Sequence, residues 1–589
     1  MEKIFLILIF VLTARLLFAQ SNLSPTKLNI KELPTAFEYF SGPDSIGENA
    51  FFKAASTNNS GFEVKLPYPI IFIHGLAGNS KTWNKFVTYL FNQYGLNFGG
   101  RFDFCLNYDG NSTMANTNFA PTTGGDLALF TLNLEVGDYY SINFDVSKNG
   151  TPYPEDNGVI GNVSSNQQAI IKQGIALKWA IYEVLQKTGR DKVILMGHSM
   201  GGLAAREYLQ NPVNWQADGT HHVAKLVTSG TPHGGSNSSS FGLGVAEVNE
   251  RMDATRDLRR FYKTSEEKGV YLFGGIENNS VINNTIFNYY NVDVNCNGVA
   301  GDNITGLNQK NIYNDLDYSC IIGECSGCID PNSGDGIVWD FSADLKNYYP
   351  GLTVNRFYYF ASAFVQIHTD LPDQYFENMQ GLDEPNRASL AYNIELNKTY
   401  TGFITIQPTI GSSTFDDYDI YKFTIANNNN INLNINNITL ADLKLQIVDV
   451  NGNIVGNTYH SNGANNINFS QYLNSGIYYL AIYGTPTTTS YLYPYNFALG
   501  IKTGISDITS EAKFSVYPNP ANDLITIKVN HAERLIDSSY AIYDNLGRQV
   551  LKGEITSEVT SVNIGQLKKG VYVLKVGEQN GKTFKVVKL

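Results

Sequence analysis

The feature that most constrains this chain is a tight turn between a buried strand and a helix. An apolar run, Val193-Ile194-Leu195-Met196, leads into Gly197-His198-Ser199-Met200-Gly201, and the stretch from Leu203 to Leu209 has a helical pattern. A strand-to-helix turn this short brings backbone segments together, so small residues are needed on both sides of the central serine. The turn would hold the hydroxyl above the sheet, at a helix N-terminus that favours negative charge. The pattern therefore predicts Ser199 as a catalytic nucleophile.

The sequence around this turn predicts a doubly wound parallel sheet over residues 66–385. Pro69-Ile70-Ile71-Phe72-Ile73 and Lys225-Leu226-Val227-Thr228 are further short apolar runs, and residues 165–186 have helical spacing. Apolar runs without alternation are what strands need when both faces of a sheet are covered. The fold class that follows is α/β.

Two further segments have the alternating pattern of β-strands. Residues 390–502 contain runs such as Gly476-Ile477-Tyr478-Tyr479-Leu480-Ala481-Ile482-Tyr483, separated by Asn/Gly turns. Residues 506–589 contain more short strands. Alternation with period two predicts all-β sandwiches, so we expect two small β-domains after the α/β domain. The first could bind an insoluble substrate or act as a spacer, and its residues do not decide between these roles.

The N-terminus has the pattern of a signal peptide. Lys3 precedes an apolar run from Ile4 to Leu12, and Ala19 offers a small residue at the expected cleavage site. Residues 1–19 are therefore predicted to be removed on export, and 20–65 to form a leader segment. Arg15 makes the apolar run short for a membrane anchor, and we expect no transmembrane segment in the mature chain. The net charge of −12 argues against a nucleic-acid partner.

Four of the five cysteines lie close together in the sequence. Cys296, Cys320, Cys325 and Cys328 share one segment, whereas Cys105 is alone. Export favours oxidation over zinc binding, so local disulfides of unknown pairing are expected.

The serine needs a base and an oxyanion hole. Ile73-His74-Gly75-Leu76-Ala77-Gly78 follows a strand where backbone N–H groups of Leu76 and Met200 could hold an oxyanion. His74 precedes the serine and is expected to fix this loop, because this fold orders its triad as serine, acid, histidine. The remaining histidines lie too close to the serine or in the β-domains: His221, His222, His233, His460 and His531. Elimination leaves His368 as the base.

The acid should lie between Ser199 and His368 in the chain. Asp335 is the chosen candidate, since Gly334 and Gly336 flank it and an apolar pair follows. It would orient the imidazole and stabilise its charged form. The rivals are Asp330, Asp340 and Asp344.

A possible calcium loop lies further upstream. Asp293, Asn295 and Asn297 place oxygen ligands at alternating positions, with Asp302 nearby. The twelfth position is Ile304 rather than Glu, so an ordinary EF-hand is not expected, and a solvated Asn-rich turn is the alternative. Structural calcium is a prediction here, and the ester chemistry itself requires no cofactor.

Three resemblances extend this interpretation. The segments 68–78, 197–202 and 229–236, with Asp335-Gly336-Ile337-Val338, resemble the bacterial lipases of the α/β-hydrolase superfamily and their inositol-deacylase-like relatives. Residues 390–502 resemble the bacterial pre-peptidase C-terminal domain. Residues 506–589, with Tyr517-Pro518-Asn519-Pro520 and a final strand at the chain end, resemble the C-terminal sorting domain of the type IX secretion system of Bacteroidetes.

These resemblances imply a secreted lipase or carboxylesterase. Its route would cross the periplasm and outer membrane through the type IX machinery, ending in release or surface attachment. Two long segments, 97–135 and 237–325, are expected as insertions that resemble lids, so the family's substrate does not carry over. The alternatives are a polyester depolymerase, a phospholipase or an amidase on the same fold, or an inert surface binding protein.

Overall fold

The computed structural model describes most of the chain, in two compact units of residues 1–501 and 502–589. The described residues are 26–27, 63–106, 128–131, 134–147, 165–237, 253–261, 268–277, 293–297, 299, 301–325, 334–361, 367–405, 417–485, 492–501, 514–529, 538–544, 547–555, 557, 559–576 and 582–589. The predicted signal peptide lies outside them. No described helix is long and apolar enough to cross a membrane.

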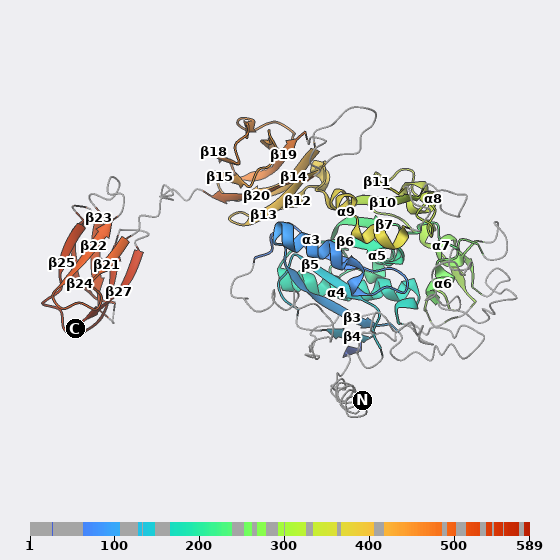
Figure 1. Cartoon of the computed structure of the whole chain (residues 1–589), viewed down its shortest axis with the longest axis horizontal. Coiled ribbons are helices and arrows are strands. Elements are labelled where there is room, and N and C mark those ends of the chain that lie inside the picture. The colour runs from blue at the N-terminus through green and yellow to red at the C-terminus, as the bar shows by residue number, and fades with distance from the viewer. Residues whose placement is uncertain are drawn as a thin grey trace, which may run out of the picture. The chain divides into compact units, whose positions relative to one another are not determined.

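A nine-stranded sheet forms the centre of the first unit (Figure 1). Its order is β1-β4-β3-β5-β2-β6-β7-β10-β11, and the strands from β3 to β11 in this order are parallel. The strands are β1 (Thr26–Lys27), β2 (Ile70–Ile73), β3 (Phe98–Cys105), β4 (Ala128–Thr131), β5 (Tyr139–Asn143), β6 (Val193–His198), β7 (Val223–Ser229), β10 (Asp317–Cys325) and β11 (Asn355–Ala361). The predicted α/β sheet is confirmed.

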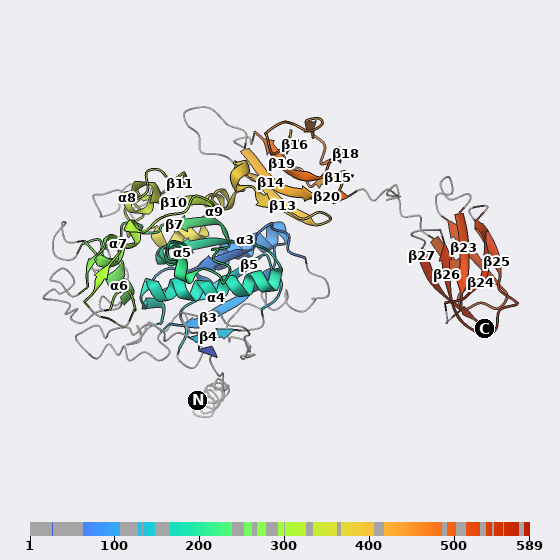
Figure 2. The same cartoon turned by 180° about the vertical axis from the view of Figure 1, so that it is seen from behind.

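Helices cover both faces of this sheet, as the alternating side chains of β2 require. Ile71 and Ile73 pack in one core with α4 (Ile170–Thr188) and α5 (Met200–Gln210). Ile70 and Phe72 pack in a second core with α3 (Asn84–Tyr94) and α9 (Tyr375–Leu382). The long helix α4 is in front in Figure 2, whereas α3 is in front in Figure 1.

The two segments expected as insertions contain parts of the sheet itself. Strand β3 lies within 97–135 and β10 lies within 237–325. The expected bounds of both insertions were therefore too wide. The second segment also contains α6 (Asp253–Asp257), α7 (Val270–Phe273), β8 (Gly275–Ile276) and β9 (Asn303–Ile304).

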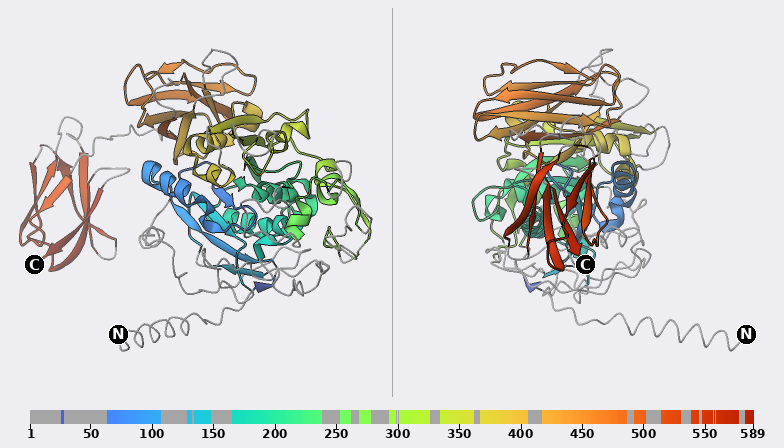
Figure 3. Two further views of the ribbon diagram at one scale, coloured as in Figure 1. Left: turned by 45° about the vertical axis from the view of Figure 1, so that its right-hand side comes forward. Right: turned by 90° about the vertical axis from the view of Figure 1, so that its left-hand side faces the viewer.

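The expected β-sandwich follows α9 and has two sheets, seen in orange in Figure 3. One sheet contains β12 (Tyr392–Asn393), β14 (Asp417–Ile425), β19 (Gly476–Gly484), β16 (Lys444–Asp449) and β17 (Tyr459–His460), and the other β13 (Thr399–Thr405), β20 (Leu492–Ile501), β15 (Asn429–Asn436) and β18 (Asn466–Leu473).

The sandwich shares its hydrophobic core with the α/β domain. Phe86 of α3 and Met379 of α9 belong to the same buried cluster as Tyr400 and Phe403 of β13. The buried guanidinium of Arg190 donates to Val64 O at 3.0 Å and to the Tyr400 hydroxyl at 3.1 Å. The two domains are therefore parts of one folded unit.

The second unit is a separate β-domain with its own core. One of its sheets contains β21 (Phe514–Tyr517), β22 (Leu524–Val529) and β25 (Val559–Asn563). The other contains β24 (Gln549–Ile555), β23 (Ser538–Tyr543), β26 (Gly570–Val576) and β27 (Lys582–Lys588). Buried Ile525, Ile542 and Leu574 come from both sheets, which agrees with the predicted sandwich.

The cysteines only partly follow the expectation of local disulfides. Cys325 is disulfide-bonded, whereas Cys105, Cys296 and Cys320 are reduced thiols. Cys328 lies outside the described residues.

Candidate active site

Ser199 occupies the turn between β6 and α5. Its backbone has φ 52° and ψ −126°, a conformation that a residue with a side chain adopts only under constraint. A Cβ at Gly201 would lie 2.5 Å from His74 O, and one at Gly197 would lie 2.4 Å from Gly202 N. The two glycines of the motif are therefore required by close backbone approaches.

The side chain of Ser199 meets His368, which begins the 3₁₀ helix η7 (His368–Asp373). His368 Nε2 lies 2.9 Å from Ser199 Oγ, and Nδ1 lies 2.6 Å from Asp335 Oδ2. All three residues are buried, with Ser199 8% and Asp335 1% exposed. The structure thus brings together three residues that lie 169 and 33 positions apart in the chain.

Asp335 is held in place by its own loop. Its Oδ1 accepts backbone N–H bonds from Ile337 at 3.0 Å and Val338 at 2.8 Å. Its carbonyl accepts from Ile367 N at 3.0 Å, one residue before the histidine. These bonds leave Oδ2 for the imidazole and fix the distance between the two side chains.

The two described rival acids have partners other than His368. Asp340 Oδ1 accepts from Phe341 N at 2.6 Å, and Asp344 pairs with Arg356 at 3.3 Å. Asp330 lies outside the described residues. Three of the excluded histidines pair with carboxylates away from the serine: His221 with Asp315, His222 with Asp218, and His460 with Asp442. His233 Nδ1 lies 3.3 Å from Arg206 Nη1, and His531 lies outside the described residues.

The loop before Ser199 contains the predicted oxyanion donor Leu76. Gly78 N donates to Gly75 O at 3.1 Å and closes a turn around Leu76. A Cβ at Gly75 would lie 2.7 Å from Ser199 Cβ, so this loop passes directly beside the nucleophile. Met200, the second predicted donor, is the first residue of α5. The roles of Leu76 and Met200 stay predictions.

His74 stabilises this loop through two hydrogen bonds to the backbone. Its Nε2 accepts the Phe144 N–H at 2.9 Å, and its Nδ1 donates to Gly75 O at 2.8 Å. Burial lowers the pKa of His74 to about 4, so the ring is neutral at pH 7. This contact set agrees with a structural role.

His198 was not singled out by the sequence, yet it touches the candidate base. Its Nε2 lies 2.9 Å from the carbonyl oxygen of His368 and must carry the proton, because a carbonyl only accepts. Burial, followed by the neighbouring His368, lowers the pKa of His198 to about 3. A neutral His198 therefore fixes the backbone of His368.

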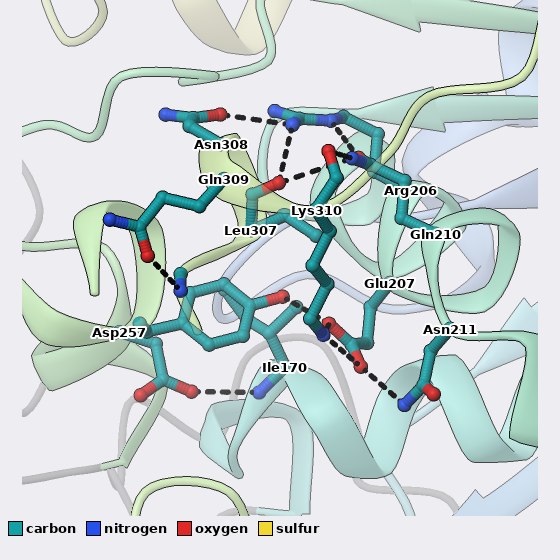
Figure 4. A network of polar contacts seen from close by, with 12 residues as sticks. Ile170, Arg206, Glu207, Gln210, Asn211, Asp257, Leu307, Asn308, Gln309 and Lys310 are labelled. Atoms are coloured by element: carbon teal, nitrogen blue, oxygen red, sulfur yellow. Dashed lines mark hydrogen bonds and ion pairs between the residues drawn. The ribbon is translucent and has the colours of Figure 1, made fainter. Parts of the chain in front are cut away.

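Helix α5 is also tied to the segment that was expected to resemble a lid (Figure 4). Arg206 donates to Asn308 Oδ1 at 2.9 Å, and Lys310 forms an ion pair with Glu207 at 2.9 Å. Gln210 Nε2 donates to the carbonyl oxygen of Leu307 at 3.1 Å. Residues 307–310 are thus a support of the nucleophile helix.

The predicted calcium loop forms hydrogen bonds within itself. Asn297 N donates to Asp293 Oδ1 at 3.0 Å, and the side-chain amides of Asn295 and Asn297 donate to Asp302 at 3.2 and 2.6 Å. Glu277 accepts from Val294 N at 2.7 Å. Calcium at this loop stays a prediction.

Two segments of the chain match known family models. Residues 67–285 match the family model described as a PGAP1-like alpha/beta domain. The first unit therefore contains a PGAP1-like α/β-hydrolase domain. Residues 515–588 match the model of the secretion system C-terminal sorting domain. This sorting domain implies export to the medium or the cell surface, and contact with the secretion machinery.

Solved structures that resemble the chain include three kinds of protein. The lin2722 gene product of Listeria innocua is 17% identical over 55% of this chain and 96% of its own, with a TM-score of 0.31. The propeptide form of the lipase BlEst2 from Bacillus licheniformis is 15% identical over 89% of this chain and 94% of its own, with a TM-score of 0.25. The pre-peptidase C-terminal domain of a Bacillus anthracis collagenase is 23% identical over 20% of this chain and 98% of its own, with a TM-score of 0.16. Among curated proteins, none matches the chain significantly.

Proposed function

We propose that the PGAP1-like hydrolase is an exported serine esterase that cleaves the acyl esters of lipids. The observation that carries this proposal is the position of His368, 2.9 Å from Ser199 Oγ and 2.6 Å from Asp335 Oδ2. A base between a hydroxyl nucleophile and a buried acid is the arrangement that acyl transfer needs.

The reaction would proceed in two steps. His368 Nε2 takes the hydroxyl proton while Ser199 Oγ bonds to the ester carbonyl carbon, and then gives that proton to the departing alcohol. Water loses a proton to His368 and attacks the acyl-serine, which releases the carboxylic acid and restores the hydroxyl. Backbone N–H groups of Leu76 and Met200 would hold the oxyanion, each contributing about 3 kcal/mol to the transition state.

Exposed aromatic side chains support an apolar substrate. Tyr358 and Phe360 on β11 are stacked with ring centroids 6.0 Å apart, and Phe360 is 74% exposed. The neighbouring Ala361 pairs with Cys325, whose N–H donates to Gly334 O beside Asp335. This aromatic pair therefore lies at the same end of the sheet as the candidate acid.

The test is hydrolysis of p-nitrophenyl esters from acetate to palmitate by the purified protein and its Ser199→Ala variant. We expect activity that increases with chain length and disappears in the variant. Activity on short chains alone would favour an esterase or polyester hydrolase. A folded protein without activity on any ester would contradict the proposal and favour an amidase or an inert binding protein.

A further inference from the structure

Amide side chains cover the outer face of one sheet of the sandwich. This sheet contains β13, β20, β15 and β18 in that order (Figures 1 and 2). Along β15, Ile431, Leu433 and Ile435 are buried in the core, and the asparagines that alternate with them lie on the opposite face. Strand β18 alternates in the same way. We refer to six outer residues of these two strands as the amide face: Asn432, Asn434, Asn436, Asn466, Asn468 and Ser470.

The pairing of β15 with β18 arranges the amide face in rows. Residue 432 lies opposite 470, 434 opposite 468, and 436 opposite 466. The Ser470 hydroxyl donates to Asn432 Oδ1. Side chains directly opposite each other have Cβ atoms about 4.5–5.5 Å apart, and outer residues of one strand follow each other at about 6.7 Å. The backbone therefore fixes a regular array of amide donors and acceptors.

Three neighbouring strands of this sheet carry no charge. No Asp, Glu, Lys, Arg or His belongs to β15, β18 or β20, whereas the other sheet of the sandwich has Asp419 and Lys422 on β14 and Lys444 on β16. Strand β18 ends its sheet, and strands in this position usually carry charges that oppose pairing with other chains. In a chain with a net charge of −12, this uncharged polar surface suits a neutral partner, because binding desolvates no charge.

We propose that the amide face binds a neutral polysaccharide. Each asparagine offers two N–H donors and a carbonyl oxygen with two lone pairs. Neighbouring hydroxyl groups of a sugar match this pattern, because each hydroxyl both donates and accepts. Tyr472, the next outer residue of β18 after Ser470, is 54% exposed and offers its ring to the C–H face of a sugar.

Other classes of partner fit this surface less well. Nucleic acid requires cations that replace its counterions, and the three strands provide none. A lipid surface requires apolar side chains, and the six residues of the amide face include none. Protein interfaces are centred on buried aromatic or arginine anchors, whereas the centre of this face is the pair Asn434 and Asn468. A neutral polymer of hydroxyl groups is the partner that remains.

The outer face of this sheet also contacts the hydrolase domain. Phe403 of β13 packs against Tyr94 of α3, with ring centroids 4.7 Å apart. In the next strand, Asn496 accepts a hydrogen bond from the Thr401 hydroxyl at 2.9 Å and lies opposite Asn436 of the amide face. One continuous sheet face therefore extends from α3 to the amide face. A polysaccharide bound there would hold the hydrolase at a polymer surface without contacting Ser199 or His368.

The experiment measures the fraction of the purified protein that binds to insoluble cellulose, chitin and curdlan, and to a gel of the anionic polymer alginate. The test variant is Asn434→Ala/Asn468→Ala, which removes the central pair. The matched control is Asn457→Ala/Asn474→Ala, which removes two exposed asparagines outside the amide face. We expect the wild type and the control to bind at least one neutral polymer but not alginate, and the test variant to bind about tenfold more weakly. Binding should persist in about 1 M NaCl, because no ion pair contributes to it.

Several results would overturn this proposal. These are binding to none of the neutral polymers, equal binding by the two double variants, and binding that is confined to alginate or abolished by salt. The salt series needs only the wild type, so it stays decisive if a variant does not fold. Sedimentation of the protein alone tests the other occupant of the face: a dimer that Asn434→Ala/Asn468→Ala dissociates would make the face a contact between two copies. None of these measurements depends on ester hydrolysis, so failure of the proposed function would be seen separately.

Discussion

The candidate active site and the carboxylates Asp383, Glu384, Asp417 and Asp419 at the start of the sandwich are both buried groups of polar side chains, but they differ in how their oxygens are paired. At the active site, Asp335 uses one oxygen for two backbone N–H groups and the other for His368. At the junction, Asp419 and Glu384 each keep a buried oxygen without a hydrogen bond. A carboxylate whose two oxygens are both paired is fixed in position and can orient a base, whereas a buried oxygen without a hydrogen bond costs folding free energy. We therefore expect changes at the first to affect turnover and changes at the second to affect stability.

The largest expected effect is on turnover, and it distinguishes the two regions. Ser199→Ala should lower kcat for p-nitrophenyl esters by about 10⁶-fold, because the nucleophile is lost. Asp419→Asn, assayed at a temperature where it is folded, should keep its kcat. Near-normal turnover by Ser199→Ala would contradict the account.

Asp335→Asn tests the role of the acid at the candidate active site. The amide is nearly the same size but cannot stabilise a charged imidazole, so kcat should fall by about 10⁴-fold. Steady-state kinetics on one soluble ester measure this. Asp340→Asn is the matched control, since that carboxylate bonds to Phe341 N instead, and it should change kcat little. Equal losses in both variants would make Asp340 an equal candidate.

His198 tests whether the support of His368 matters for turnover. His198→Phe removes the N–H that holds the His368 carbonyl, so kcat should fall on the order of 10-fold while KM stays constant. His198→Gln can still donate and should recover part of the loss. A purely structural role would lower the melting temperature of His198→Phe and leave kcat unchanged.

The buried His74 makes the folding stability of the protein depend on pH. Its pKa is lowered from 6.5 to about 4 by burial, so the unfolded chain binds the proton more tightly than the folded chain. This contribution to stability is fully present above pH 6.5 and is lost as the pH falls toward 4. The shift corresponds to about 3 kcal/mol.

Urea unfolding at pH 7.5 and 4.5 measures the effect of His74. The wild type should lose more stability than His74→Asn between these two pH values, whereas His460→Asn, on an exposed histidine of the sandwich, should follow the wild type. An identical pH dependence of the unfolding free energy in all three proteins would contradict the lowered pKa of His74.

The smallest expected effect concerns the substrate. Phe360→Ser should lower the rate on palmitate esters a few-fold and leave the acetate ester unaffected, because it removes an exposed ring that would meet a long acyl chain. Val213→Ser, an exposed apolar side chain in η3 (Pro212–Asn214), serves as the control. Equal rates for Phe360→Ser and the wild type on palmitate would remove the aromatic pair from the substrate site.

Local signals explain what the sequence could predict. The strand, turn and helix around Ser199 are adjacent in the chain, and the steric demand for Gly197 and Gly201 is visible in their spacing. His368 followed from the order of elements and from the small number of histidines. These inferences needed no knowledge of distant contacts.

The features that the sequence did not reveal depend on distant contacts. Asp383 and Asp417 are 34 positions apart, and nothing in either segment indicates that they meet. The shared core between α3 and β13 likewise joins segments far apart in the chain. Strand β10 was missed inside an Asn-rich stretch, although its Cys320-Ile321-Ile322 run is the same signal that identified the other strands.

The most direct test of the central claim is covalent labelling by an organophosphonate, followed by peptide mass spectrometry. The account predicts one adduct per chain, on the peptide that contains Ser199, with esterase activity lost in proportion to labelling. It also predicts no adduct in Ser199→Ala. An active enzyme that stays unlabelled, or that is inactivated by labelling at another residue, would contradict the assignment of Ser199 as the nucleophile.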